Sequence, residues 1–435
     1  MTIGVGLLGC GTVGSGVVKL LRQRQAEIEA RVGDRVEIVA VAVRDLAKAR
    51  VSELGSVRLT ASPAEVVQDP RVNVVVELMG GLEPAKTHVL DALSRKKAVV
   101  TANKALLAYH GPEIFRAARE ARVDVAFEGA VGGGVPVVRA LRDALAGDRV
   151  KRIVGILNGT SNYVLTRMQR EGLGFDEVVR DAQRLGYAEA DPSLDVDGHD
   201  AAHKLVVLSA LAFGRRVRPE EVDTRGLRSL EPVDHACADR FGFVVKPLAV
   251  AEDTGLSDPE RGPCLALRVG PALVSKDALL GSVSGVLNAV LLEGDALGPL
   301  VLSGRGAGEG PTAVSVVSDV LDVARAIHEG STGMLTAALR TEPSWVRAAG
   351  EDVLPHYARF VVRDEPGVLG RITTSLGRAG VSIRELVQLR RGDTNADVIM
   401  LTHASSRAAF EAALAEVDVA PFAVEKTRLF PVVAA

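Results

Sequence analysis

A glycine-rich turn near the start of the sequence constrains the fold more than any other feature. Residues 3–8 are a continuous apolar run, Gly9-x-Gly11-x-x-Gly14 follows directly, and a helical pattern runs from about 15 to 30. The first glycine of such a turn permits a tight bend, the second lets the backbone approach a pyrophosphate, and the third lets helix pack on strand. Phosphate then meets N–H groups at the helix N-terminus. The pattern predicts a dinucleotide site formed by Gly9, Gly11, Thr12, Val13 and Gly14.

Strands and helices alternate through the first third of the chain. Helical patterns separate further apolar runs that are typical of buried strands. Alternation of this kind indicates βαβ units and a parallel sheet. We therefore predict an α/β fold in which residues 1–130 form a doubly wound Rossmann sheet. The further apolar runs are 36–43, 72–79, 98–101 and 123–127.

The pattern of the chain changes around residue 150. Residues 131–306 mix strand and helix patterns, which predicts a second, α+β domain. Residues 329–355 are rich in Gly, Ser, Thr and Pro and are expected to form a linker. Residues 356–435 show the order strand, helix, strand, strand, helix, strand, which predicts a ferredoxin-like domain.

Composition argues against several partners and locations. The net charge is −3, from 52 basic and 55 acidic residues, so no nucleic acid or anionic membrane is expected as a partner. Cys10, Cys237 and Cys264 lie far apart, which fits a reducing, cytoplasmic location and no disulfide framework. The uncharged stretch 1–18 has no positive start and is rich in glycine, so we expect neither a signal peptide nor a membrane helix.

The end of the second predicted strand bears on the choice of cofactor. An acidic residue there favours the ribose 2′-hydroxyl of NAD, whereas an arginine favours the 2′-phosphate of NADP. Arg44 comes first and Asp45 follows it. We predict NADP as the cofactor, with NAD as the alternative. The other interpretation of Arg44 is a solvated surface charge.

Charged residues gather in two further places. Lys104 follows the fourth predicted strand, at the edge where open parallel sheets bind ligands. The stretch 186–204 holds five carboxylates and ends with Asp200 and Lys204, which share one face of a predicted helix. A lysine beside carboxylates can bind a zwitterion and exchange a proton. The alternative is a solvated acidic loop, and the spacing does not fit a calcium loop of the EF-hand type.

The same stretch resembles the signature of the homoserine dehydrogenase family. The matching pattern is Ala182-x3-Gly186-Tyr187-Ala188-x2-Asp191-Pro192-x2-Asp195-Val196-x-Gly198-x-Asp200-x3-Lys204, without gaps. The segment 362–369, after the first strand of the C-terminal unit, resembles an ACT domain. Five further blocks resemble the family in the same order along the chain: 6–14, 99–104, 127–136, 158–162 and 306–313.

The resemblance implies an oxidoreductase that reversibly reduces L-aspartate 4-semialdehyde to L-homoserine with NAD(P)H, in threonine, methionine and isoleucine biosynthesis. Lys204 matches the proton donor of the family, and Asp200 matches its acidic neighbour. Gly308 matches a position that closes over the cofactor, and the helix at 307–328 would return to complete the first domain. The implied substrate-binding positions are Gly186, Glu189, Asp195 and Lys104, the last also near the cofactor.

The resemblance also implies a structural sodium ion, an oligomer and regulation. Oxygen ligands suit hard ions of this kind, and a buried, hydrogen-bonded carboxylate is the alternative for Glu128. The second domain, 131–306, would carry catalysis and the contacts of a homodimer or homotetramer. ACT domains bind amino acids, so threonine is the expected effector. Because the chain starts at the first strand, no fused aspartate kinase is expected. The implied sodium ligands are the carboxylate of Glu128 and the backbone of Val131, Gly133 and Val135.

Two other functions are alternatives to this one. Another ACT-bearing Rossmann dehydrogenase, of the phosphoglycerate or prephenate type, would lack the block from Glu189 to Lys204. A catalytically inactive, nucleotide-binding amino-acid sensor would not need to keep Lys204, Asp200 and Glu189. We therefore predict an enzyme.

Overall fold

The first part of the chain folds around a parallel sheet. The structure is a computed structural model that describes residues 2–337, 339 and 341–435. The strands of this sheet are β1 (Thr2–Leu8), β2 (Arg35–Ala42), β3 (Arg58–Thr60), β4 (Val74–Glu77), β5 (Ala98–Thr101) and β6 (Val125–Ala126). Their spatial order is β3-β2-β1-β4-β5-β6. The order reverses between β1 and β4, which is where open α/β sheets bind ligands.

Helices cover both faces of this sheet because its strands are apolar on both sides. One face packs against α1 (Thr12–Gln23), α2 (Gln25–Val32) and α12 (Glu309–Glu329), and the other against α3 (Pro63–Gln68), α4 (Ala85–Ser94) and α5 (Lys104–Ala121). The late helix α12 lies against α1 at Gly16, where a Cβ would come 2.8 Å from the Cβ of Ala313. The chain therefore returns to its first sheet after the second domain.

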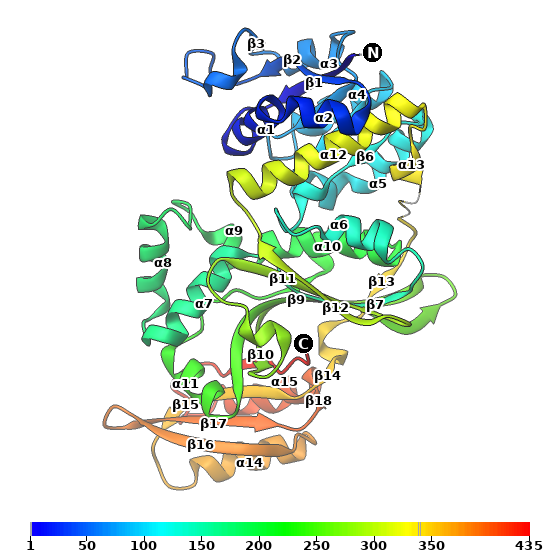
Figure 1. Ribbon diagram of the computed structural model, residues 1–435. Coiled ribbons are helices and arrows are strands. Elements are labelled where there is room, and N and C mark those ends of the chain that lie inside the picture. Colours follow the sequence, from blue (N-terminus) through cyan, green and yellow to red (C-terminus); the bar gives the residue numbers. More distant parts are fainter. Residues whose placement is uncertain (1, 338, 340) are drawn as a thin grey trace.

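A second, mixed sheet follows (Figure 1). Its main path contains β7 (Val150–Ile156), β9 (Phe243–Asp258), β10 (Gly262–Ser275), β11 (Leu287–Gly294), β12 (Gly298–Arg305) and β13 (Trp345–Val346), in the order β12-β11-β7-β9-β10-β13, and β8 (Asp223–Thr224) pairs with β10. Helix α10 (His199–Phe213) contacts α5 on one side and β9 on the other. It is therefore held between the two sheets. The other helices here are α6 (Val137–Arg139), α7 (Gly159–Glu171), α8 (Phe175–Arg184), α9 (Ser193–Val196) and α11 (Pro232–Arg240).

The C-terminal unit has the predicted ferredoxin-like topology. Its strands β15 (His356–Arg363), β16 (Ile383–Arg391), β17 (Asn395–Thr402) and β19 (Arg428–Pro431) have the order β16-β17-β15-β19. One face packs against α14 (Val368–Arg378) and α15 (Arg407–Val417). The other packs on residues of α7 and α11, so this unit is joined to the second domain by an apolar core. Within the described ranges, every helix is too short or too polar to span a bilayer.

The segment 329–355, expected to be a linker, is paired on both sides. β13 pairs with β10, and the indole N–H of Trp345 donates to the carbonyl of Gly262 at 3.0 Å. β14 (Val353–Leu354) pairs with β18 (Ser405–Ser406) of the C-terminal unit. A short helix, α13 (Met334–Ala337), precedes them. The Gly and Pro residues therefore separate short attached elements and do not form a free tether.

Candidate active site

The Gly9–Gly14 turn has the shape that a bound pyrophosphate requires. Gly9 has a φ of +103°, and a Cβ there would lie 2.8 Å from the carbonyl oxygen of Leu78. A Cβ at Gly14 would lie 2.7 Å from the carbonyl oxygen of Gly9. Gly11 instead faces open space, and no described side chain caps the N-terminus of α1. The first N–H groups of α1 are thus available to an anion, which fits a dinucleotide phosphate.

An open cleft of about 2100 Å³ lies beyond this turn. Residues from the glycine turn, from the loop after β2 and from the second domain line it. Val13 and Gly14 lie behind the turn, in the first helical turn of α1. The cleft joins most of the predicted dinucleotide residues to one predicted substrate residue. The lining includes Gly9, Gly11, Thr12, Arg44, Lys48, Arg50 and Glu189.

Arg44 stands in a basic group at the rim of this cleft. It is exposed, and Lys48 and Arg50 line the same side. Asp45, the competing acidic residue, accepts the backbone N–H of Ala47 at 2.9 Å. That carboxylate is therefore engaged by its own loop. The arrangement offers positive charge to a ligand at the end of β2.

A buried carboxylate, Glu77, fixes the floor of the cleft. It ends β4 and accepts the N–H groups of Met79 at 2.8 Å and Gly80 at 3.2 Å. Its other oxygen accepts the hydroxyl of Thr101 at the end of β5. The sequence analysis missed Glu77, although an acidic residue at the carboxyl end of a buried parallel strand is a usable signal.

Lys104 is placed by the start of α5. Asn103 caps this helix by accepting the N–H of Leu106 at 3.1 Å, and its amide donates to the carbonyl of Gly81 at 2.7 Å. Lys104 is the first residue of the helix, and its side chain is 35% exposed. Its ammonium therefore projects from the carboxyl edge of the first sheet toward the second domain.

Asp200 joins two lysines in what we call the lysine–aspartate cluster, formed by Lys104, Asp200 and Lys204. Nζ of Lys204 donates to Oδ2 of Asp200 at 2.7 Å and to the carbonyl of Leu157 at 2.7 Å. Nζ of Lys104 lies 2.9 Å from Oδ1 of Asp200. Asp200 and Lys204 are buried. An ammonium has three N–H groups, so Lys204 keeps one for a ligand.

Neighbouring charges shift the pKa values of Asp200 and Lys104 in the directions that favour their charged forms. Burial alone would raise the pKa of Asp200, but the charges of Lys204 and Lys104 outweigh it and hold that pKa well below its usual range. Burial would lower the pKa of Lys104, but Asp200 and, more weakly, Asp195 and Glu189 raise it above its usual value. Because Glu189 also lines the cleft, the cleft and the cluster share one electrostatic field.

Asn158 connects the predicted carboxylates, a role that the sequence analysis did not assign. Its amide nitrogen donates to Oδ1 of Asp195 at 2.7 Å and to Oδ2 of Asp200 at 2.8 Å. Its oxygen accepts the N–H of Ser161 at 2.8 Å and so caps α7. Burial raises the pKa of Asp195. An Asn directly after a strand and before a helix is the available signal for such a cap.

Two predicted glycines lie at the edges of the site. Gly186 follows α8 with a φ of +76° and faces open space, three residues before Glu189. Gly308 has a φ of +118° and directly precedes α12, which an ion pair of 2.6 Å between Lys19 and Glu309 ties to α1. Gly308 is not among the described residues that line the cleft.

The predicted sodium ligands lie on one buried loop after β6. Both oxygens of Glu128 already accept backbone N–H groups, from Val138 at 2.9 Å and Arg139 at 2.8 Å. Burial raises the pKa of Glu128. Carboxylate and carbonyl oxygens have more than one lone pair, so the donor set still fits a hard monovalent ion. The carbonyls of this set belong to Val131, Gly133, which accepts Ser315 Oγ at 2.6 Å, and Val135, which accepts Val137 N–H at 2.8 Å.

Comparison with known proteins finds the same organisation. Residues 9–128 match the family model described as homoserine dehydrogenase, NAD binding domain. Residues 136–321 match the model described as homoserine dehydrogenase, and residues 356–421 match the ACT domain. The chain is similar along almost its whole length to a homoserine dehydrogenase of Synechocystis, at 46% identity over 422 residues, which is 96% of each protein.

Solved structures agree with this. A homoserine dehydrogenase from Thiobacillus denitrificans superposes with a TM-score of 0.92 at 40% identity, over 100% of this chain and 99% of the other. The S. aureus homoserine dehydrogenase at pH 7.5 superposes with a TM-score of 0.77 at 30% identity, over 99% of each chain. Full-length similarity at this level covers the cleft, the lysine–aspartate cluster and the C-terminal unit together.

Proposed function

The chain belongs to the homoserine dehydrogenase family of oxidoreductases, which interconvert L-aspartate 4-semialdehyde and L-homoserine with a nicotinamide cofactor, and we propose which of its residues do this and how. The observation that carries the proposal is the placement of the lysine–aspartate cluster in the electrostatic field of a cleft that begins at the glycine turn. A catalytically inactive sensor is not favoured, since all members of the cluster are present.

The first domain, 1–130 with α12, holds the cofactor in this proposal, and 131–306 provides the substrate site. The pyrophosphate lies on the N-terminus of α1, approached through Gly11. A bound nicotinamide supplies or accepts the hydride. The turn after β4, held by Glu77, forms the wall of the cleft beside it. Gly308, directly before α12, is the residue proposed to close over the bound cofactor.

Lys204 is the proton donor in reduction and the acceptor in the reverse direction. When the aldehyde is reduced, its oxygen becomes an alkoxide that needs both charge stabilisation and a proton. The free N–H of Lys204 supplies both, while Asp200 and the carbonyl of Leu157 fix its direction. Asp200 stays ionised because two lysines flank it. It therefore positions both ammonium groups through one reaction cycle.

The remaining predicted residues bind the amino-acid part of the substrate. Glu189 faces the cleft and suits the substrate ammonium, and Lys104 suits the substrate carboxylate or its reacting oxygen. Asp195, held by Asn158, contributes a further carboxylate to the substrate site in this proposal. The left-handed turn at Gly186 brings Glu189 to this place.

We propose NADP as the preferred cofactor, with NAD as a second. The basic group of Arg44, Lys48 and Arg50 supports this preference because it offers several cations to a 2′-phosphate. Asp45 does not oppose it, since its carboxylate is bound to the N–H of Ala47.

A structural sodium ion at Glu128, Val131, Gly133 and Val135 is part of the proposal. It is tested by thermal unfolding in sodium chloride against equal potassium or choline chloride. The native chain should melt at a higher temperature in sodium. Glu128→Gln should lose that difference, and a difference that persists unchanged in this variant contradicts the site.

The C-terminal unit is proposed to bind an amino-acid effector, and threonine is the first candidate. The second domain is proposed to form the contacts of a homodimer or homotetramer, and the protein is proposed to work in the cytoplasm.

Initial rates test the whole proposal. L-Homoserine should support reduction of NADP⁺, and more slowly of NAD⁺, measured by nicotinamide absorbance at alkaline pH with and without threonine. A chain that binds nucleotide but turns over neither cofactor would favour the inactive sensor.

A further inference from the structure

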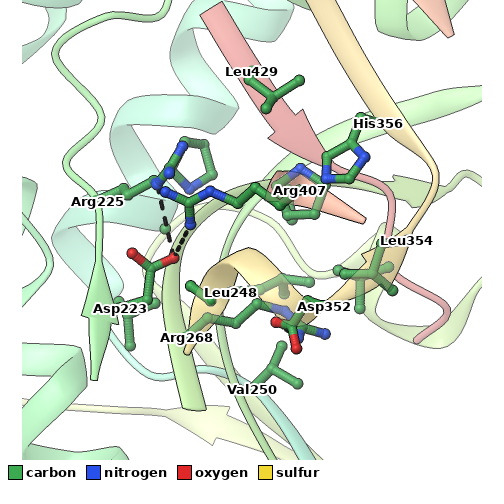
Figure 2. Close-up of a pocket in the computed structure, with 17 residues that line it drawn as sticks. Asp223, Arg225, Leu248, Val250, Arg268, Asp352, Leu354, His356, Arg407 and Leu429 are labelled. Carbon is green, nitrogen blue, oxygen red and sulfur yellow. Dashed lines mark hydrogen bonds and ion pairs between the residues drawn. The ribbon is translucent and has the colours of Figure 1, made fainter. Parts of the chain in front are cut away.

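A cavity that opens to solvent, of about 530 Å³ with the open solvent included, lies between the second sheet and the C-terminal unit (Figure 2). Apolar walls come from Leu248 and Val250 of β9 and from Leu354 and Leu429 of the C-terminal segment. None of its described lining residues also lines the cleft at the glycine turn. It is therefore a second site, distinct from the dinucleotide cleft. Its charged lining consists of Asp223, Arg225, Arg268, Asp352, His356 and Arg407.

Two of these polar side chains have buried atoms without a partner among the described residues. Arg268 donates through Nη1 to Asp352 at 3.0 Å, but its buried Nε has no partner. His356 is 3% exposed, and its Nδ1 has none either. Burial lowers the pKa of His356 to about 4, so the ring is neutral near pH 7. Buried polar atoms are normally paired, so each of these two has a hydrogen-bonding position to offer a bound molecule.

Positively and negatively charged side chains lie close together in space around the cavity. Arg407 donates to Asp223 at 2.6 Å, and Nε of Arg225 lies 3.7 Å from the same carboxylate (Figure 2). Arg268 and Asp352 form a second pair on the opposite side. Guanidinium groups suit a carboxylate, and carboxylates suit an ammonium. The apolar walls between them suit a short aliphatic side chain.

We propose that this cavity binds a free α-amino acid with a small aliphatic side chain, and that its occupancy regulates the active site. The inference rests on the amino-acid regulation proposed above and gives that regulation a place. The ligand would touch the C-terminal unit through Arg407 and His356 and the second domain through Asp223 and Arg268. A bound molecule would therefore join the two units.

The structure contains a short connection from this cavity to the lysine–aspartate cluster. β8, which carries Asp223, packs on the start of α10, because a Cβ at Gly198 would lie 3.0 Å from the side chain of Thr224. Just beyond β8, the N–H of Leu227 donates to the carbonyl of Val196 at 2.9 Å. The segment after β8 thus holds the turn that directly precedes the helix of Asp200 and Lys204. A ligand that engages Asp223 acts on that turn.

Neighbouring alanines allow a matched test. Ala349 lines the cavity, whereas Ala348 is exposed and is not part of the lining. Ala349→Leu fills the cavity, and Ala348→Leu adds the same volume outside it. Binding of L-threonine, L-isoleucine and L-methionine to the full chain is measured by calorimetry. The rate of homoserine oxidation is measured with and without each amino acid.

At least one probe should bind the native chain and change KM or kcat. Ala349→Leu should weaken that binding by about tenfold or more, and Ala348→Leu should leave it unchanged. Arg268→Gln removes the guanidinium that would hold the carboxylate of the ligand, so it should also weaken amino-acid binding. This variant is the one to measure if Ala349→Leu does not fold. Absence of binding by every probe overturns the inference, as does binding that survives both cavity variants or is lost equally in Ala348→Leu. Turnover without added amino acid tests the proposed function separately.

Discussion

The side-chain amide of Asn158 donates a hydrogen bond of 2.8 Å to Oδ2 of Asp200, the same oxygen that accepts from Lys204. Because Asn158 is itself fixed as the cap of α7, the position of Asp200 depends on where that helix begins. Lys204 is thus placed by a chain of contacts that runs through the second domain to the start of α7. Asn158 acts through Asp200 and is a positioning residue.

Replacing Asn158 should therefore slow the chemical step. Asn158→Ala should lower kcat about ten- to a hundredfold with a smaller change in KM, because a hydrogen bond to a charged group contributes about 1.5–3 kcal/mol. Asn158→Ser keeps a capping residue but cannot reach both carboxylates, so it should fold normally and still lose kcat. Initial rates of homoserine oxidation measure both variants.

A matched control exists in the C-terminal unit. Ser406 caps α15 by accepting the N–H of Ala409, far from the cluster. Ser406→Ala should cost about 1 kcal/mol of stability and leave kcat unchanged. Normal kcat in Asn158→Ser would show that this residue only caps its helix.

Lys204→Ala should remove turnover while the chain still binds nucleotide. A positioned proton donor contributes about a hundred- to ten-thousandfold in rate, and the glycine turn lies on another domain. Rates and nucleotide titrations measure the two effects separately. Lys104→Ala is the comparison, and it should raise KM for homoserine more than it lowers kcat. A near-normal kcat in Lys204→Ala would assign the proton transfer elsewhere.

Arg44→Ala should reduce kcat/KM for NADP⁺ by about tenfold and leave that for NAD⁺ within a factor of about two, because only the 2′-phosphate uses this charge. The ratio of the two cofactor rates is the measurement. Arg116 on α5 is exposed and distant from the cleft, so Arg116→Ala controls for a change in net charge. An equal loss with both cofactors would contradict a contact to the 2′-phosphate.

Much of the fold was predictable because its signals are local. The parallel sheet and the ferredoxin-like unit are confirmed, since continuous apolar runs and a repeated order of elements specify them. Asp200 and Lys204 could be paired from their spacing on one helix. Helix α7 has a weak local signal, because it begins with polar and capping residues that resemble a loop.

Other features depend on which segments the fold brings together. Asn158 and Asp200 are far apart in the sequence, and the packing of α10 against β7 and β9 places them in contact. The cavity of Figure 2 combines β10 with strands that follow it by many residues. No local pattern of charge or hydropathy encodes such juxtapositions, so sequence reasoning could not place them.

Asp319 should make stability depend on pH. It is fully buried on α12, accepts the N–H of Glu128 at 2.7 Å, and burial raises its pKa to about 7. In an unfolded chain the pKa of an aspartate is about 3.9. Between these values the folded protein keeps a proton that the unfolded chain has lost, so the free energy of unfolding falls as pH rises through this window. Each unit of pKa corresponds to about 1.4 kcal/mol.

Asp319→Asn removes this titration. The melting temperature of this variant minus that of the native chain should therefore increase as the pH is raised from about 5 to about 8. Asp322→Asn makes the same charge change one helical turn away, at a side chain that is 21% exposed, and should show no such trend. Parallel melting curves of the native chain and Asp319→Asn across this range would contradict the assignment.

Arg359 should be a large contributor to the attachment of the C-terminal unit. Its side chain is fully buried, and it donates to Asp234 of α11 at 2.8 Å and to Glu231 at 2.9 Å. Tyr357 donates to Asp234 as well, at 2.8 Å. Arg359→Met leaves the buried carboxylate of Asp234 without its cation, which should cost about 3–5 kcal/mol in denaturant unfolding. Arg359→Met combined with Asp234→Asn removes both charges and keeps the bond from Tyr357, so most of that loss should return. If the double variant is as unstable as the single one, the loss arises from packing around Arg359 and not from an uncompensated charge.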